Sequence, residues 1–167
     1  MNKKRVWDEK VSKKTNEIWR SDDSSFYKGE HYYMLRVYYE DTDAAGIVYY
    51  ANYLKFAERA RTEMIRKLGV EHGQLMSQNN AAFAVRSCDV DYIKPARLDD
   101  KLSVITNVNS IAGASVKLNQ RVVILDNDYN ETELVRLKLR LACLDKSQRP
   151  MRMPIDIRDA IATINEL

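Results

Sequence analysis

The chain has 167 residues, of which 45% are hydrophobic, enough for one compact domain with a sizeable core and too few for two ordinary domains. Its 27 basic and 24 acidic side chains nearly cancel, which leaves a formal net charge of +3. This composition argues against wholesale disorder, and it lacks the dense basic patch of a nucleic-acid-binding protein, so we expect no nucleic-acid partner.

The start of the chain and its cysteines favour a cytoplasmic protein. Charged residues rather than an apolar stretch follow Met1, so we expect no signal peptide, and no run approaches the roughly 18 apolar residues of a membrane span. Cys88 and Cys143 lie in separate apolar runs, outside any CxxC pair. We therefore expect two reduced core thiols, with a disulfide or a reactive thiol as the less favoured alternative.

Residues 1–31 differ from the rest of the chain in being dense in charges. The apolar residues among them recur at roughly helical spacing, which predicts a short amphipathic helix: Trp7, Val11, Ile18 and Trp19. We interpret this segment as a partly helical arm that packs on its own domain or on a neighbouring subunit, with a membrane-surface helix as the alternative. Residues 32–167 then form the single domain.

A strand and a long helix follow the arm. Alternation predicts a half-buried strand over 32–39, with one face formed by Tyr33, Leu35, Val37 and Tyr39. Asn52 is a suitable N-cap for a helix over 53–68, and Gly69 is a natural stop. One side of that helix is apolar, with Phe56, Ala57, Ala60, Met64 and Leu68. A shorter helical turn is expected over 72–78.

The second half of the chain is mostly strand. Candidate strands cover 82–93, 102–108, 116–124 and 135–143, the last two joined by a turn at 126–128, and a short helix is predicted over 155–164. Successive strands without intervening helices indicate an antiparallel sheet, so the fold class is α+β, with five strands wrapped on one long helix. Such a sheet often covers its leftover apolar surface by pairing with a second copy.

The sequence lacks the common catalytic and metal-binding signatures. His31 and His72 are far apart and have no metal-ligand spacing around them, and there is no GxSxG elbow, P-loop or GxGxxG fingerprint. The run Asp41-Thr42-Asp43 begins like a calcium loop, but the remaining ligand positions are apolar and the final glutamate is missing. We therefore expect no metal site.

The segment between the first strand and the long helix is the strongest candidate site. It holds Asp43 where free N–H groups and the positive end of the helix dipole converge. Such a place can stabilise a developing oxyanion while a carboxylate stays ionised nearby. From the residues alone, an acidic turn before a helix is more often a cap than a catalyst.

Around Asp43 the chain reads Arg36-Val37, then four residues, then Thr42-Asp43-Ala44-Ala45-Gly46-Ile47-Val48, with Tyr53 beyond. This block resembles the active-site signature of the 4-hydroxybenzoyl-CoA thioesterase family, whose members have the hot-dog fold. The stretches ERARTEM at 58–64 and DYIKPARLDD at 91–100 are similar to the branch encoded beside the Tol-Pal envelope system. The resemblance covers about residues 32–150 and excludes the arm.

The resemblance implies a reaction and a site. The family hydrolyses acyl-CoA thioesters, and the aspartate matching Asp43 acts as nucleophile or as general base on water. Backbone N–H groups near Tyr50 and Ala51 would polarise the thioester carbonyl, and Tyr49, Tyr50 and Glu58 would line the acyl pocket. The family needs no metal and no redox cofactor, since coenzyme A is part of the substrate, and it forms its sites at subunit interfaces of dimers or tetramers. An acyl-carrier protein is an alternative carrier of the acyl group.

Two positions leave alternatives open. The Tol-Pal-associated branch usually has a histidine where this chain has Tyr50, and a phenol with a pKa near 10 cannot serve as a general base at neutral pH. Tyr50 would then hydrogen-bond or shape the pocket, and the carboxylate would do the proton or nucleophile work. Glu58 has the alternative interpretation of an exposed acid that pairs with Arg59 or Arg61.

Two other functions compete with hydrolysis. A hot-dog dehydratase would need a histidine paired with its acid, and neither histidine is beside Asp43 in sequence, although His72 could reach it through folding or from a partner subunit. A non-catalytic module that binds acyl-CoA or an envelope or lipid-synthesis protein would fit the missing histidine. Six basic strand residues are candidate phosphate contacts but are more simply a solvated face: Arg86, Lys117, Arg121, Arg136, Lys138 and Arg140.

Overall fold

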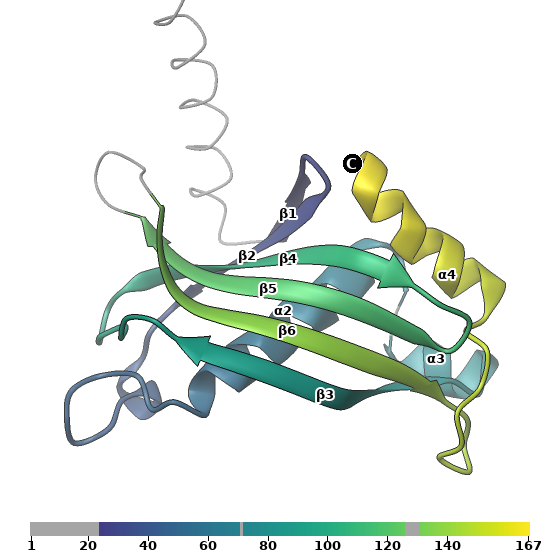
Figure 1. Cartoon of the computed structure of the whole chain (residues 1–167), viewed down its shortest axis with the longest axis horizontal. Coiled ribbons are helices and arrows are strands. Elements are labelled where there is room, and N and C mark those ends of the chain that lie inside the picture. Colours follow the sequence, from purple (N-terminus) through teal and green to yellow (C-terminus); the bar gives the residue numbers. More distant parts are fainter. Residues whose placement is uncertain (1–23, 71, 126–130) are drawn as a thin grey trace, which may run out of the picture.

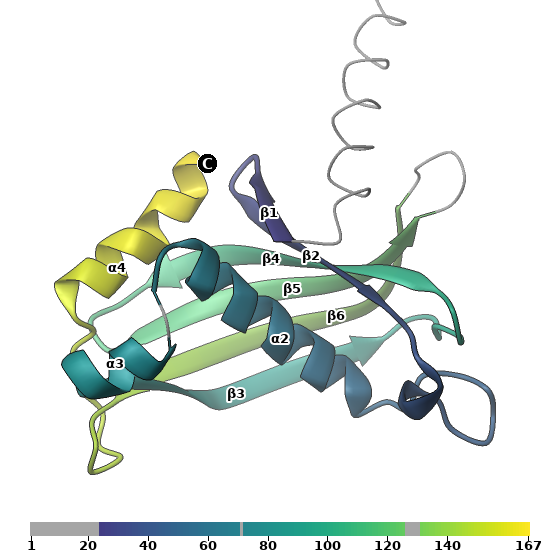
Figure 2. The same cartoon turned by 180° about the vertical axis from the view of Figure 1, so that it is seen from behind.

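The computed structural model describes residues 24–70, 72–125 and 131–167. The helix predicted in the arm and the turn predicted at 126–128 lie outside these residues. Within them, one antiparallel sheet curves around a single long helix, α2, which lies across one face (Figures 1 and 2). This arrangement confirms the α+β class and the antiparallel sheet.

The sheet has six strands in the order β1-β2-β4-β5-β6-β3, and every neighbouring pair is antiparallel. The strands are β1 (Ser24–Tyr27), β2 (Glu30–Arg36), β3 (Ala82–Tyr92), β4 (Lys101–Ile111), β5 (Ser115–Leu125) and β6 (Glu131–Leu144). Among the described strands, short β1 forms one edge and the 11-residue β3 forms the other (Figure 1).

Two expectations about the first strands were wrong. The sheet has six strands instead of five, because β1 pairs with β2 and carries the sheet back to Ser24, ahead of the boundary expected at residue 32. The strand expected over 32–39 ends at Arg36, and Tyr39 is 82% exposed at the start of a 3-10 turn, η1 (Tyr39–Asp41). The apolar alternation therefore runs past the point where pairing with β4 stops.

Helix α2 spans Asn52–Lys67 and buries an apolar stripe that includes Phe56, Ala57 and Ala60. Gly69 ends the helix with a φ of +82°, a conformation that glycine adopts without steric cost. Asn52 is not the N-cap that the sequence predicted. It is the first helical residue, Ala51 occupies the cap position, and the buried Asn52 amide donates to the Asp41 carbonyl oxygen instead, at 2.9 Å.

The core has two parts along α2. Residues of its first half, such as Tyr53 and Phe56, pack with Val37 and the inner faces of β4 and β6. Met64 and Ile65 of its second half pack with α3 (His72–Gln78) and α4 (Ile155–Ala162), which is followed by the 3-10 turn η2 (Thr163–Glu166). The loop before α2 and the helices α3 and α4 therefore lie at opposite ends of the sheet (Figure 2).

A polar network crosses the interface between α2 and the sheet. Gln120 of β5 is fully buried, and its Nε2 donates to the Ala57 carbonyl oxygen at 3.0 Å and to the Thr106 hydroxyl at 2.9 Å. Its Oε1 accepts a hydrogen bond of 2.8 Å from Arg61 Nη1. Each polar group of the Gln120 amide is thus satisfied inside an otherwise apolar face.

Candidate active site

The loop between β2 and α2 is held in place by Asp41, which is only 7% exposed. One carboxylate oxygen of Asp41 accepts the Tyr38 N–H at 2.9 Å. The carbonyl oxygen of Asp41 accepts the Tyr49 N–H and the Asn52 side-chain amide, both at 2.9 Å. Asp41 therefore ties the beginning of the loop to the beginning of α2.

Asp43 lies in a tight turn at the tip of this loop and is exposed. Its N–H donates to the Ile47 carbonyl oxygen and its own carbonyl accepts the Gly46 N–H, both at 2.9 Å, with Gly46 at a φ of +72°. The carboxylate oxygen Oδ1 accepts the Ala45 N–H at 2.8 Å, while Oδ2 accepts no hydrogen bond from the described residues. The turn orients the carboxylate and leaves one oxygen free to meet a ligand.

Hydrogen-bond donors are available next to this turn. The Asn52 N–H donates to the Tyr49 carbonyl oxygen at 2.9 Å, which closes a β-turn with Tyr50 and Ala51 at its centre. Within the described part of the chain, the N–H groups of Tyr50 and Ala51 donate to no protein acceptor. They lie at the N-terminal end of the 16-residue helix α2, where the helix dipole favours negative charge.

A cavity of about 430 Å³ opens beside Asp43, with mostly apolar walls that include four tyrosines. It is lined by Asp43, Ile47, Val48, Tyr49, Tyr50, Tyr53, Tyr92, Ile93, Lys94 and Pro95. The rings of Tyr49 and Tyr50 are 4.7 Å apart, and Tyr92 stands edge-on to Tyr50 at 6.2 Å and to Tyr53 at 6.0 Å. An apolar or aromatic acyl group would meet ring surfaces here, with the carboxylate at the margin.

The structure raises the pKa of three tyrosines of this cavity, so their phenols stay protonated at neutral pH. The neighbouring Tyr50 phenol raises the pKa of Tyr49, mainly through a hydrogen bond, with smaller contributions from desolvation and from the charge of Asp43. Burial raises the pKa of Tyr53 and of Tyr92. Tyr53 accepts the Ala96 N–H at 2.8 Å, and the Tyr92 hydroxyl donates to the Tyr50 carbonyl oxygen at 3.1 Å. These phenols are therefore hydrogen-bonding groups rather than bases.

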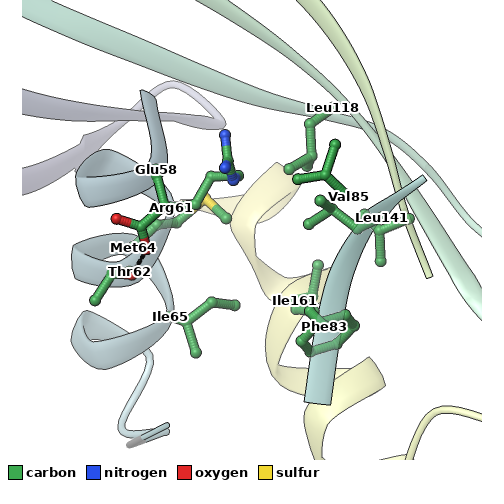
Figure 3. A pocket seen from close by; sticks show the side chains of 11 residues that line it. Glu58, Arg61, Thr62, Met64, Ile65, Phe83, Val85, Leu118, Leu141 and Ile161 are labelled. Atoms are coloured by element: carbon green, nitrogen blue, oxygen red, sulfur yellow. Dashed lines mark hydrogen bonds between the residues drawn. The ribbon is translucent and has the colours of Figure 1, made fainter. Parts of the chain in front are cut away.

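Glu58 does not line the cavity of Asp43. It lies further along α2 and borders a separate cavity of about 140 Å³ between α2, the sheet and α4 (Figure 3). Its carboxylate accepts the Thr62 hydroxyl at 2.8 Å, and no ion pair with Arg59 or Arg61 forms among the described residues. Arg61 instead reaches towards the sheet and Gln120, and burial lowers the pKa of its guanidinium.

The remaining candidates are dispersed over the molecule. His31 is buried in β2 and lines no part of the Asp43 cavity, and α3, which begins at His72, lies at the far end of α2 (Figure 2). Lys117, Lys138 and Arg140 line a groove on the solvated face of the sheet, away from α2. Both cysteines are free thiols, and Cys143 is buried.

Within residues 24–70, 72–125 and 131–167, no cluster of three or more His, Cys, Asp or Glu side chains is placed to hold a metal ion. The helices in these ranges include none long and apolar enough to cross a membrane.

The structure thus brings Asp43, Tyr49 and Tyr50 together at one cavity, next to Ala51, and places Glu58 elsewhere. Two aromatic walls, Tyr53 and Tyr92, were not predicted as site residues. Both belong to stretches that carried the family resemblance, Tyr53 after the Asp43 block and Tyr92 in the run 91–100. Their roles depend on contacts between segments about 40 residues apart, which no local pattern shows.

Comparisons with known proteins show the family of this chain. The thioesterase-like superfamily pattern matches residues 37–161. The acyl-CoA thioesterase YbgC of Haemophilus influenzae is 39% identical over 127 residues, which are 75% of this chain and 90% of that protein. The acyl-CoA thioester hydrolase YbgC of an Escherichia coli O6:H1 strain is 43% identical over 125 residues, 74% of this chain and 89% of that protein.

Solved structures give the same picture of the fold. A probable thioesterase from Bartonella henselae superposes with a TM-score of 0.69 at 32% identity, covering 75% of this chain and 99% of that one. The 4-hydroxybenzoyl-CoA thioesterase of Pseudomonas sp. strain CBS-3 superposes with a TM-score of 0.72 at 20% identity, covering 78% and 98%. The chain therefore belongs to the thioesterase-like superfamily and has its hot-dog fold.

Proposed function

We propose that this protein hydrolyses an acyl-CoA thioester to a free acid and coenzyme A at the cavity beside Asp43. One observation carries the proposal: an exposed carboxylate lies in the same loop as two N–H groups at a helix N-terminus, and among the described residues one carboxylate oxygen and both N–H groups have no hydrogen-bond partner. The names of the YbgC relatives, acyl-CoA thioesterase and acyl-CoA thioester hydrolase, support the same reaction.

Each group has a definite part in this proposal. The N–H groups of Tyr50 and Ala51 would receive the thioester oxygen as it gains negative charge. Asp43 would either attack the carbonyl carbon, breaking the C–S bond to give a mixed anhydride that water then opens, or take a proton from the attacking water. In both routes the sulfur leaves as a thiolate and is protonated to free coenzyme A.

The surroundings of Asp43 favour hydrolysis over dehydration. A dehydratase would need a histidine next to its acid, and buried His31 faces a different part of the core. Tyr50, at the position of the histidine of related sequences, contributes an aromatic wall. Glu58 stays a candidate only if a second copy brings it to the Asp43 cavity, since within one chain it borders a different cavity.

The protein is proposed to act as a homo-oligomer in the cytoplasm. The 11-residue β3 leaves one edge of the described sheet unpaired, and such an edge is a template for pairing with a second copy. The two free thiols are consistent with a reducing compartment. An acyl-carrier protein, which holds acyl groups as the same kind of thioester, is the alternative donor to coenzyme A.

The first test is thiol release from short aliphatic, long aliphatic and aromatic acyl-CoAs, using wild type, Asp43→Asn and Asp159→Asn. Asp159 is an exposed aspartate on α4, so its amide variant matches the charge change away from the site. We expect Asp43→Asn to lower kcat by at least about 100-fold with an unchanged melting temperature, and Asp159→Asn to behave as wild type. A folded wild type that releases no thiol from any member would favour the non-catalytic binding module instead.

A further inference from the structure

The central peptide of the turn before α2 is held from outside the loop. The Tyr92 hydroxyl, at the end of β3, reaches the Tyr50 carbonyl oxygen at 3.1 Å. A carbonyl oxygen can only accept, so the phenol is the donor in this bond. Tyr92 is 48% exposed and lines the Asp43 cavity, so the bond lies at the margin of the site rather than in the core.

This bond controls the direction of an N–H group. The described chain contains no cis peptide bond, so the Tyr50 C=O and the Ala51 N–H lie in one rigid plane and point in opposite directions. Drawing the carbonyl towards β3 therefore turns the Ala51 N–H away from β3. That N–H has no acceptor among the described residues, and it lies at the end of α2 that favours negative charge.

The orientation of this peptide also defines the type of the turn. The two common turn types differ by a flip of the peptide between their central residues, here Tyr50 and Ala51. Ala51 has a φ of −71° and a ψ of −20°, and the flipped form would force a non-glycine residue to a positive φ. The backbone thus prefers the unflipped turn, and the hydrogen bond from Tyr92 further restricts the orientation of the Tyr50–Ala51 peptide. It also polarises the peptide, because a donor on the C=O makes the N–H of the same unit a stronger donor.

We propose that Tyr92 is a positioning residue of the hydrolytic site: its hydroxyl orients and polarises the Tyr50–Ala51 peptide, whose N–H receives the thioester oxygen. The inference rests on the proposed function. Tyr92 does not touch the reacting atoms in this scheme and acts through the backbone. Its aromatic ring has a separate part as a wall of the cavity, which a phenylalanine would keep.

Tyr92→Phe removes the donor and keeps the ring. We expect kcat to fall roughly 3- to 10-fold, the effect of one hydrogen bond realised in the transition state, with an unchanged KM and melting temperature. Tyr32→Phe is the matched control, because the Tyr32 hydroxyl also donates at 3.1 Å, to Glu30, and Tyr32 lies in β2, towards the opposite edge of the sheet. That control should leave both kinetic constants unchanged.

A spectroscopic readout separates positioning from a merely structural role. The acyl-CoA identified by the release assay, labelled with ¹³C at its thioester carbonyl, would be bound to Asp43→Asn, which slows turnover. We expect the carbonyl resonance of the complex to move downfield of the free ligand, and to return part of the way in Asp43→Asn/Tyr92→Phe.

The outcomes distinguish the two proposals. If Asp43→Asn abolishes hydrolysis but Tyr92→Phe leaves kcat unchanged, the inference is overturned and the proposed function stands. A change confined to KM or to melting temperature, or a lower kcat with an unmoved carbonyl resonance, also overturns it. A folded wild type without hydrolysis, by contrast, rejects the proposed function itself.

Discussion

Asp41 and Asp43 lie two residues apart in the loop before α2 and have different surroundings. Asp41 is buried and its oxygens accept hydrogen bonds from three donors, so it stabilises the loop. Asp43 is exposed and keeps one oxygen unbonded within the described chain. The spacing of the family signature singled out Asp43, and Asp43 lines the cavity. The sequence did not show that Asp41 would anchor the loop, because the anchoring depends on whether the folded loop brings the Tyr38 N–H and the Asn52 amide within hydrogen-bond distance of Asp41.

Asn52 illustrates the limit of local rules at the residue scale. Asparagine before an apolar run is a typical N-cap, but here its amide satisfies the buried Asp41 carbonyl and the helix begins one residue earlier than expected. The Asn52 side chain is itself buried, so its amide would be left without an acceptor if it did not reach Asp41, and that would cost more than leaving an exposed helix end uncapped.

His31 should make the protein sensitive to acid. The side chain is fully buried, its ring packs on Phe26 at 5.0 Å, and neither ring nitrogen has a hydrogen-bond partner among the described residues. Burial, with a smaller contribution from the charge of Lys67, lowers the pKa of His31 from 6.5 to about 4. Between pH 6.5 and 4, His31 is therefore protonated in the unfolded chain but stays neutral in the native state. The free energy of unfolding consequently falls as the pH drops through this range.

We predict that His31→Leu removes this part of the acid sensitivity. At pH 5 the linkage costs the wild type about 2 kcal/mol of unfolding free energy relative to pH 8, and the leucine variant should lose correspondingly less. Urea unfolding at pH 8, 6 and 5 measures the difference. Parallel pH profiles for the two proteins would show that His31 is not buried as a neutral ring.

At the scale of elements, periodicity was a sufficient guide for most of the fold. The apolar stripe of α2 and the alternation in β5 and β6 located these elements, because a one-face-buried helix or strand repeats its burial along its length. The strand β1 was missed because Ser24–Tyr27 has only four residues and no alternation to detect. Gln120 was missed as a core residue because a polar residue on a strand is usually expected to face solvent. Here the Gln120 side chain instead donates a hydrogen bond to α2.

The polar network around Gln120 should couple α2 to the sheet. Gln120→Leu would leave the Ala57 carbonyl and the Arg61 guanidinium without their partner, and we expect a loss of about 2–4 kcal/mol of unfolding free energy. Adding Arg61→Met should recover at least about 1 kcal/mol, because the orphaned charge is then gone. Urea unfolding of the four proteins of this cycle gives the coupling. Losses that simply add would mean that Arg61 finds water in place of Gln120.

At the scale of the whole molecule, the two edges of the sheet are unequal. One edge is the short β1, whereas β3 is long and exposes Val85 at 50% and Tyr92 at 48%. Proteins usually protect long edges, so an unpaired one invites a partner strand. The sequence predicted a second copy from the single helix on a large sheet, but it could not show which edge would be free, because strand order is a property of the folded chain.

We therefore predict that a charge on this edge weakens self-association. Val85→Lys should shift sedimentation from a multiple of the chain mass of 19.4 kDa towards that mass at micromolar concentration. Met76→Lys is the control, since Met76 is comparably exposed, at 43%, but lies on α3 away from the edge. A wild type that sediments as a monomer, or a Val85→Lys variant that assembles normally, would contradict pairing through β3.

The strand that offers this edge also carries Tyr92, whose hydroxyl holds the peptide at the start of α2. Assembly and turnover would consequently share one structural element, and by mass action each would depend on the other. Dilution below the dissociation constant would free the edge, loosen the end of β3 and lower the rate per chain. A bound acyl-CoA that favours the same orientation of the peptide would in turn tighten the association of the subunits.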